Sequence, residues 1–280
     1  MDKRQILADI FKDTQEFYTL NKKLAESIVV SGRNTTFYDA DDYPEIKRAA
    51  NRNGRISVSK LKTIQSSMKL HSDYPEKKIT ILNFASATNP GGGVKKGSSA
   101  QEESLCRCST LYPSLTQKWV YEKYYRRNRE EKDNLHTDAI IYTPGVVVCK
   151  TDDSFPERLA EADWITVDVI SCAAPNLRDK PANAYNQDFG KSVKISNDEL
   201  YQIHVKRARH ILHIAALNNA DVLVLGAFGC GAFQNNPEVV AKAYADVLPD
   251  YKKYFDLVEF AIYCNRYETG NYDAFKEYIK

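Results

Sequence analysis

The chain has 280 residues, 43% of them hydrophobic and 27% charged, which is enough for one large core with an appended small subdomain. Its 39 Lys and Arg residues nearly balance 37 Asp and Glu residues, so the net charge of +2 excludes a general attraction to nucleic acid or anionic lipid. No apolar run approaches the roughly 20 residues of a membrane helix, and we expect a cytoplasmic protein with no membrane partner.

The first 75 residues predict a mainly helical accessory segment. Apolar residues at three-to-four spacing predict a helix over 4–28. Further along, the pattern predicts a short strand and acidic loop over 35–46, a strand over 55–59 and a helix over 60–70. We expect these elements to flank the rest of the chain, residues 76–280.

From Lys78 onward, strands and helices alternate more clearly. A β-branched run over 77–86 ends at a glycine loop, and a helix is expected from about Ala100. A capping box of Ser196 and Glu199 opens the helix predicted over 196–218, and another helix is expected after Asn236. Five further apolar runs predict core strands: 139–142, 146–149, 164–171, 221–225 and 257–263. The sequence therefore predicts a three-layer α/β fold, in which ligands collect at loops that leave the carboxyl ends of strands.

Two glycine loops are the candidate binding sites. In the first, over 89–103, three consecutive glycines allow a ligand to approach the backbone closely. A surface turn in which Ser99 and Glu102 cap a helix would explain the acidic residues, but not the glycines. The second loop, over 226–233, follows a strand and precedes a helix, a setting in which backbone N–H groups bind a diphosphate. Its spacing matches neither a P-loop nor the dinucleotide fingerprint, and Phe233 is either core or a platform for a ribose.

Other conspicuous residues carry weaker signals. The basic and aromatic stretch 119–133 could contact phosphates, although a solvated helix end is the simpler interpretation. Three histidines on the predicted helix 196–218 have no acidic residue at metal-ligand spacing, so we expect no metal. The cysteines are scattered and predict neither disulfides nor a zinc site: Cys106, Cys108, Cys149, Cys172, Cys230 and Cys264.

Taken together, these motifs resemble the bacterial-type poly(ADP-ribose) glycohydrolases of the macrodomain superfamily. Their signature is three glycines, six to eight residues, and Gln-Glu-Glu; here Gly91, Gly92 and Gly93 precede Gln101, Glu102 and Glu103 by seven residues. The flanking sequence NFASATNP and the loop LGAFGCGAFQNNP also look similar to that family. The resemblance covers about 75–280 and implies a three-layer α/β/α macrodomain with a mixed central sheet.

The resemblance also implies roles for individual residues. Glu103 would be the catalytic acid, with Glu102 on the ribose hydroxyls beside the scissile bond. Gly91, Gly92, Gly93 and the neighbouring Asn89 would shape the catalytic loop around the distal ribose, and Gln101 would be a further substrate-binding residue. Residues Gly229, Cys230, Gly231, Ala232 and Phe233 would hold the diphosphate, with Phe233 orienting the ribose. Asn83 would be a buried hydrogen bonder, and the adenine pocket would draw on the N-terminal segment or the region 263–272.

The implied reaction cleaves ribose–ribose O-glycosidic bonds of poly(ADP-ribose) and releases ADP-ribose. Glu103 would protonate the departing oxygen and then activate water, with no metal and no cofactor. The resemblance further implies poly(ADP-ribosyl)ated proteins as substrates, a monomer, and a part in the DNA damage response.

Three rival functions stay open. A non-catalytic macrodomain that reads ADP-ribose would use both loops, although the glutamate pair argues against it. A hydrolase of mono-ADP-ribosyl groups or of O-acetyl-ADP-ribose would share the pocket and attack another leaving group. A dinucleotide oxidoreductase is the weakest alternative, because its glycine fingerprint and ribose-binding acid are missing.

Overall fold

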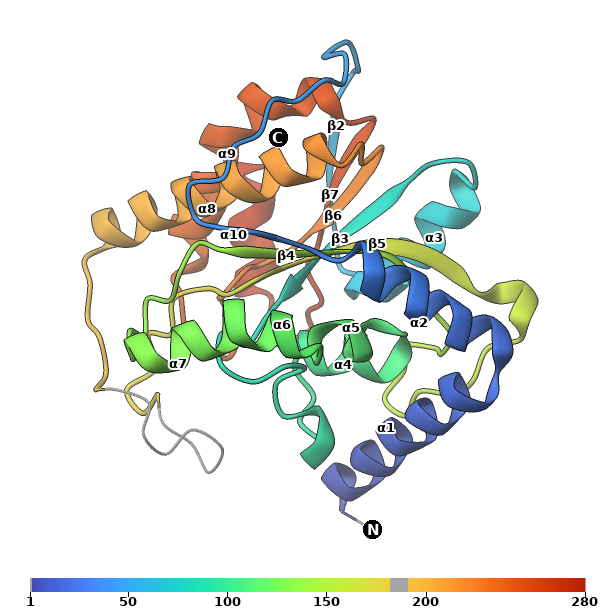
Figure 1. The fold of residues 1–280 in the computed structure, drawn as a ribbon. Helices are drawn as coiled ribbons and strands as arrows, with labels where there is room; N and C mark the ends of the chain where they lie inside the picture. Colours follow the sequence, from blue (N-terminus) through green and yellow to red (C-terminus); the bar gives the residue numbers. More distant parts are fainter. Residues whose placement is uncertain (1, 182–190, 280) are drawn as a thin grey trace.

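A seven-stranded mixed sheet forms the centre of the molecule (Figure 1). This computed structural model describes residues 2–181 and 191–279. The strands in chain order are β1 (Thr36–Tyr38), β2 (Arg55–Ser59), β3 (Ile79–Phe84), β4 (Ile140–Val148), β5 (Ile165–Cys172), β6 (Val222–Leu225) and β7 (Leu257–Ala261). Their order across the sheet is β1-β4-β5-β3-β6-β7-β2, in which β4 runs antiparallel to both neighbours and the strands from β5 to β2 are parallel.

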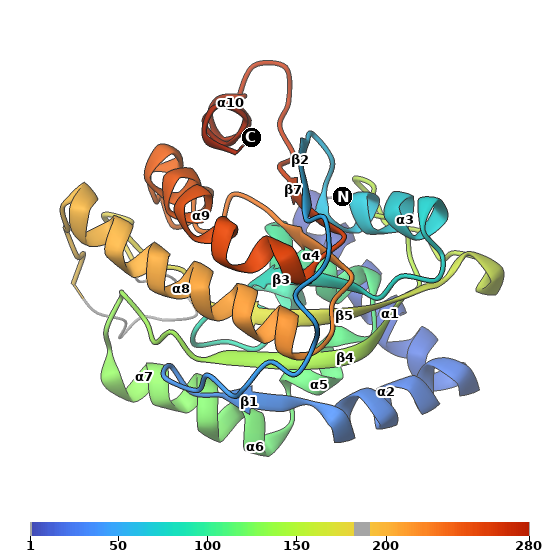
Figure 2. The ribbon, with the colours of Figure 1, turned by 90° about the horizontal axis from the view of Figure 1, so that it is seen from above.

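Helices cover both faces of this sheet (Figure 2). One face carries α8 (Asn197–Leu217), α9 (Pro237–Tyr251) and α10 (Gly270–Tyr278). The other side carries α1 (Lys3–Leu20), α2 (Lys22–Asn34), α3 (Thr63–Asp73), α4 (Gln101–Cys108), α5 (Leu111–Leu115), α6 (Lys118–Val120), the π-helix η2 (Tyr121–Arg126) and α7 (Arg127–Glu131). Short 3-10 helices are η1 (Val94–Lys96), η3 (Glu161–Asp163) and η4 (Lys252–Tyr254). The predicted three-layer α/β/α fold with a mixed sheet is confirmed.

Each face buries its own hydrophobic core, because successive residues of a strand point to opposite sides. In β3, Leu82 packs with α8 and α9, whereas Ile81 packs with the helices of the other face. The predicted capping box of α8 is also confirmed, since Ser196 and Glu199 bond to each other's backbone N–H groups. Within the described ranges, no helix combines the length and hydropathy needed to cross a bilayer.

The N-terminal 75 residues contribute to the sheet itself. Both of its edge strands, β1 and β2, come from this segment, and they lie at opposite sides of the sheet. Helix α1 from the same segment packs against η1 in the first glycine loop, where an added Cβ on Gly97 would meet the backbone oxygen of Arg4. The sheet is therefore built from strands of this segment and from strands of the residues that follow it.

The boundaries predicted for one helix and for two strands are wrong. The single helix expected over 4–28 is two helices, because Asn21 has extended backbone angles. Its N–H donates to Phe17 O and ends α1, while its side chain accepts from Leu24 N and caps α2.

The two strands expected over 139–142 and 146–149 are the single strand β4. Its register with β5 shifts between Thr143 and Val146, which marks a β-bulge. Gly145 adopts φ +70° there and donates its N–H to Asp168 Oδ1 at 3.0 Å. The Pro-Gly sequence therefore bends the strand without ending it.

Candidate active site

The two predicted glycine loops lie side by side at the carboxyl edge of the sheet. They follow β3 and β6, which pair with each other in parallel, so both loops leave the sheet at the same edge. The rings of Phe84 and Phe228 lie 5.8 Å apart, and an added Cβ on Gly226 would lie 2.9 Å from Phe84 Cζ. The two glycine loops, which are far apart in the sequence, therefore surround the same region at this edge of the sheet.

Helix α4 presents the glutamates from a fixed position beside β3. Gln101, its first residue, accepts a hydrogen bond from Phe84 N at 2.9 Å through Oε1 and donates to Leu82 O at 2.7 Å through Nε2. These contacts attach the start of α4 to the strand, so Gln101 positions the glutamates that follow it. The alternative in which Ser99 and Glu102 cap this helix is wrong, because Ala100 precedes the helix without any side-chain cap.

Glu102 is buried beneath the first loop and is 3% exposed. Its Oε2 accepts from Ser86 N at 2.8 Å, and its Oε1 lies 3.4 Å from Asn83 Nδ2. Asn83 also donates to Ser171 Oγ at 3.0 Å, as expected of a buried hydrogen bonder. Burial raises the pKa of Glu102 well above its ordinary value, and the neighbouring charge of Glu103 raises it further. This carboxyl therefore favours its protonated form.

Glu103 faces the middle of the glycine loop. Its Oε1 accepts a hydrogen bond from Gly93 N at 2.8 Å, and its side chain is 8% exposed. Gly92 has φ +56°, and an added Cβ there would lie 2.5 Å from Glu103 Oε1 and 3.1 Å from Glu102 Oε2. Glycine is required at this position both by its backbone angle and by the two carboxylates that approach it.

Asn235 and His204 support the second loop, and sequence reasoning did not single out either for this role. The Asn235 Nδ2 donates to three backbone oxygens, at 2.7 Å to Pro175 and at 3.2 Å to Gly229 and Phe233. Its Oδ1 lies 2.7 Å from His204 Nε2. Burial lowers the pKa of His204 to about 4, so the imidazole is neutral and donates from Nε2.

The residues of the second loop differ in what surrounds them. Gly229 has φ +80° and would clash with Ala174 if it carried a Cβ, whereas an added Cβ on Gly231 would meet nothing within 4 Å. Phe233 is half-buried, with the Arg178 guanidinium 5.7 Å from its ring centroid. Cys230 packs against the core, which raises the pKa of its thiol. Gly231 and Ala232 are exposed, so they form the accessible rim of this loop.

The region considered for the adenine pocket follows β7 at the same edge of the sheet. Its tyrosines Tyr263 and Tyr267 are exposed, and the Lys62 ammonium lies 5.5 Å from the Tyr263 ring centroid. These aromatic rings are accessible beside a positive charge, and their role as an adenine pocket stays a prediction.

The basic stretch over 119–133 is solvated at its end and on one face only. Tyr124 and Tyr125 of the π-helix are fully buried in the core. Arg126 and Arg127, in contrast, form ion pairs on the surface, the former with Glu122 and Glu130. One face of this stretch therefore packs beneath the sheet while the other meets solvent.

The histidines of α8 form separate structural hydrogen bonds. His210 Nε2 bonds Asp42 O and His213 Nε2 bonds Pro44 O, so both rings secure the N-terminal segment. Across residues 2–181 and 191–279, no three His, Cys, Asp or Glu side chains gather as a metal site would require.

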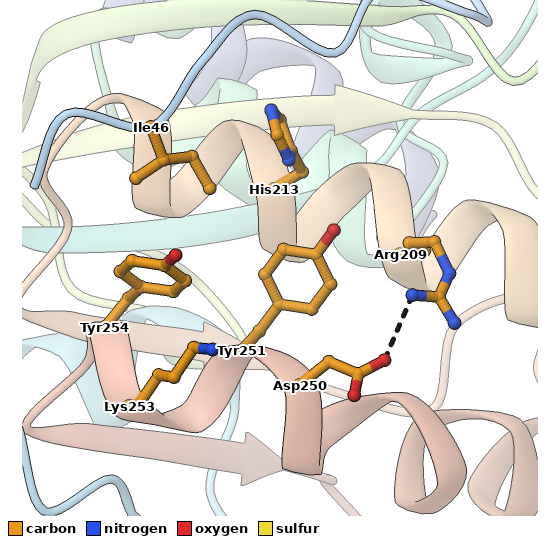
Figure 3. A pocket seen from close by; sticks show the side chains of 7 residues that line it. All are labelled: Ile46, Arg209, His213, Asp250, Tyr251, Lys253 and Tyr254. Atoms are coloured by element: carbon orange, nitrogen blue, oxygen red, sulfur yellow. Dashed lines mark hydrogen bonds and ion pairs between the residues drawn. The ribbon is translucent and has the colours of Figure 1, made fainter. Parts of the chain in front are cut away.

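A hollow of about 450 Å³ lies at the opposite end of the parallel strands from the glycine loops (Figure 3). It is formed by α8, the end of α9, η4 and Ile46, and Arg209 and Asp250 pair across it at 3.0 Å. Because η4 leads into the amino end of β7, this hollow is separate from the glutamate pair.

Comparisons with known proteins identify the family and similar solved structures. The model of the microbial-type PARG catalytic domain matches residues 9–151, slightly more than half of the chain. Poly(ADP-ribose) glycohydrolase from Thermomonospora curvata, bound to the inhibitor ADP-HPD, superimposes with a TM-score of 0.79 at 28% identity, covering 98% of this chain and 99% of that one. The poly(ADP-ribose) glycohydrolase from Deinococcus radiodurans, in complex with ADP-ribose, superimposes with a TM-score of 0.74 at 31% identity, covering 89% of this chain and 95% of that one. A comparison with curated proteins gave no match.

Proposed function

The chain belongs to the microbial-type poly(ADP-ribose) glycohydrolases, which are glycosidases, and from this premise we propose that Glu103 is the acid and base of its reaction. The substrate is poly(ADP-ribose) attached to protein, and the product is free ADP-ribose. The observation that carries this assignment is the position of Glu103, whose Oε1 is fixed by Gly93 N–H at 2.8 Å beside Gly92, where the missing Cβ lets the carboxylate approach the loop.

Hydrolysis of a ribose–ribose bond needs one proton delivered and one removed. The bond between C1 of the distal ribose and the 2′-oxygen of the preceding unit breaks through an oxocarbenium-like transition state. Glu103 gives its proton to the departing 2′-oxygen, and its carboxylate then accepts a proton from the water that bonds to C1. The enzyme returns to its starting state, because one proton is given and one is recovered.

Glu102 has a different part in this proposal. Both of its oxygens face hydrogen-bond donors of the protein, and burial favours its protonated form. Glu102 thereby keeps a second negative charge away from Glu103 and orients the ribose hydroxyls.

The second loop is proposed to bind the diphosphate. Residues 226–235 contain no acidic side chain, and their support by neutral Asn235 and His204 adds no negative charge. The open space at Gly231 lets an anion approach the backbone, and the Arg178 guanidinium beside Phe233 is a nearby cation. Phe233 would contact the ribose between the diphosphate and Glu103.

The test is release of ADP-ribose from poly(ADP-ribosyl)ated protein by the wild type and by Glu103→Gln. We expect release by the variant to fall by about 10²- to 10⁴-fold, the usual contribution of acid–base catalysis, because glutamine cannot transfer the proton. Calorimetry should show that both proteins bind ADP-ribose with similar affinity. Glu16→Gln, on the exposed side of α1, is the matched control and should keep wild-type activity.

The same assay distinguishes the rival functions. A wild-type protein that binds ADP-ribose and releases none would be a reader module. Release from mono-ADP-ribosylated protein but not from the polymer would indicate another leaving group. Unchanged release by Glu103→Gln would show that a different group donates the proton.

A further inference from the structure

Arg129 of α7 contacts the first glycine loop, unlike the two arginines before it. Its Nε donates to Thr88 O at 2.7 Å, and its Nη2 donates to Asn89 Oδ1. Arg126 and Arg127 instead pair with acidic side chains at the surface. One guanidinium therefore holds two consecutive residues that lie just before the three glycines.

A short series of hydrogen bonds leads from Asn89 to Glu103. The backbone oxygen of Asn89 accepts from Gly92 N at 2.9 Å, which closes a turn over the first glycines. The next residue, Gly93, donates its N–H to Glu103 Oε1. Two hydrogen bonds thus connect the turn at Asn89, through Gly92 and its neighbour Gly93, to the Glu103 carboxylate.

The support behind Arg129 is rigid. Tyr124 and Tyr125, in the π-helix that leads into α7, are buried in the core below the sheet. Asn128 is also buried; its Nδ2 donates to Tyr124 O at 2.9 Å and its Oδ1 accepts from Thr137 N at 3.1 Å. Because the residues directly before Arg129 are anchored in the core, the guanidinium has little freedom to follow a moving loop.

We propose that Arg129 is a positioning residue for the glycosidase reaction, which fixes the turn at Thr88 and Asn89 and through it the place of Glu103. This inference rests on the proposed role of Glu103. A planar guanidinium supplies two donors at a fixed angle to two acceptors on the same segment, whereas a lysine ammonium is a single point charge on a flexible stem. A positive charge at this position is therefore not enough to hold both Thr88 and Asn89 in place.

The experiment compares Arg129→Lys and Arg129→Ala with the wild type. We expect kcat for ADP-ribose release to fall about tenfold or more in both variants, because a small displacement of a catalytic group costs much of its effect. The Kd for ADP-ribose should change by less than about threefold, since Arg129 acts on the loop and not on the ligand. Arg126→Ala, one turn earlier on the surface, is the control and should keep its kcat within about twofold.

Chemical rescue separates positioning from folding. Added guanidinium at tens of millimolar should restore part of the activity of Arg129→Ala, methylammonium should not, and neither should restore Glu103→Gln. Wild-type kcat in Arg129→Lys, or no rescue in a variant that melts at the wild-type temperature, would overturn the proposal. A loss of ADP-ribose affinity as large as the loss of kcat would show that Arg129 supports ligand binding and not the position of Glu103, and would overturn the proposal. Activity lost in Glu103→Gln but kept in both Arg129 variants would overturn only this inference, whereas an inactive wild type would overturn both.

Discussion

The two glycine loops at the carboxyl edge of the sheet are held in place by different chemistry. Ionisable side chains surround the first loop, where Gly93 N–H meets the Glu103 carboxylate and the Arg129 guanidinium binds Thr88 and Asn89. A neutral amide supports the second loop, where Asn235 donates to three backbone oxygens. The loops look alike in sequence, because both are rich in glycine and follow a buried strand.

The difference matches what each loop is proposed to do. The first loop must hold the Glu103 carboxyl group in a fixed place, where it can transfer a proton. Ionisable side chains are therefore part of its support. The second loop must accept a diphosphate, and a carboxylate in its support would repel that ligand. Burial acts on both supports in the same way, since it raises the pKa of Glu102 and lowers that of His204, and thus favours the neutral form of each.

Among the variants that compare the two loops, the largest effect is expected from adding one methyl group to each loop. Gly92→Ala places a Cβ 2.5 Å from Glu103 Oε1 at a φ of +56°, so we expect kcat to fall about 100-fold. Gly231→Ala enters open space where the diphosphate would lie, so its KM should rise while kcat changes little. Steady-state release of ADP-ribose from polymer separates the two effects.

Gly32→Ala is the control for this pair. Its added Cβ would make only ordinary contacts with Gln117 inside α2, away from both loops, and its kcat and KM should stay at wild-type values. Equal losses of kcat in Gly92→Ala and Gly231→Ala would contradict a division of labour between the loops.

The sequence predicts those features of the fold and site that depend on neighbouring residues. The strand run predicted over 77–86, the α8 capping box and both glycine loops are local patterns, and each is present in the structure, the run as β3. The break at Asn21 was missed because asparagine is tolerated inside helices, and only its two caps reveal the boundary. The bulge at Gly145 was missed because a Pro-Gly pair usually ends a strand.

The supports of the loops could not be predicted, because they join distant segments. Arg129 lies 40 residues from Asn89, and His204 lies 31 residues from Asn235. In the sequence, Arg129 is one of several cations in a basic stretch, and Asn235 is one of two adjacent asparagines before a helix. Only the packing of α7 and α8 against the sheet gives these side chains their partners.

An intermediate effect is expected from removing the neutral support of the second loop. Asn235→Asp replaces a buried amide by a group that cannot donate to the oxygens of Pro175, Gly229 and Phe233. The oxygens of Gly229 and Phe233 keep backbone N–H donors, whereas Pro175 O loses the donor it has here. We expect the Kd for ADP-ribose to rise about tenfold and the free energy of unfolding to fall by about 2 kcal/mol, the cost of leaving one buried acceptor without its donor. Calorimetry and urea unfolding measure the two quantities.

The neighbouring residue provides a matched control. Asn236 caps α9 by accepting from Glu238 N, and aspartate caps helices equally well, so Asn236→Asp should change stability little. If Asn235→Asp bound ADP-ribose as tightly as the wild type, the second loop would keep its shape without this amide.

The smallest effect concerns how stability depends on pH, where the two loops should show opposite signs. The pKa of His204 falls from 6.5 to about 4 on folding, so the unfolded chain binds more protons in that window and stability is lost as pH falls through it. The pKa of Glu102 rises above 4.5 on folding, so the folded chain binds more protons and stability is lost as pH rises above 4.5. Between pH 4.5 and 6.5, the contributions of His204 and Glu102 to the free energy of unfolding change in opposite directions and partly cancel.

Two variants expose these contributions separately. His204→Gln keeps a donor for Asn235 Oδ1 and removes the titrating group, so its unfolding free energy should fall less steeply on acidification than that of the wild type. Glu102→Gln removes the buried carboxyl and should gain stability relative to the wild type as pH rises from 4.5 to 7.5. Urea unfolding across that range gives both slopes. If both variants kept the wild-type slope, these two side chains would not be the groups that burial holds in their neutral forms.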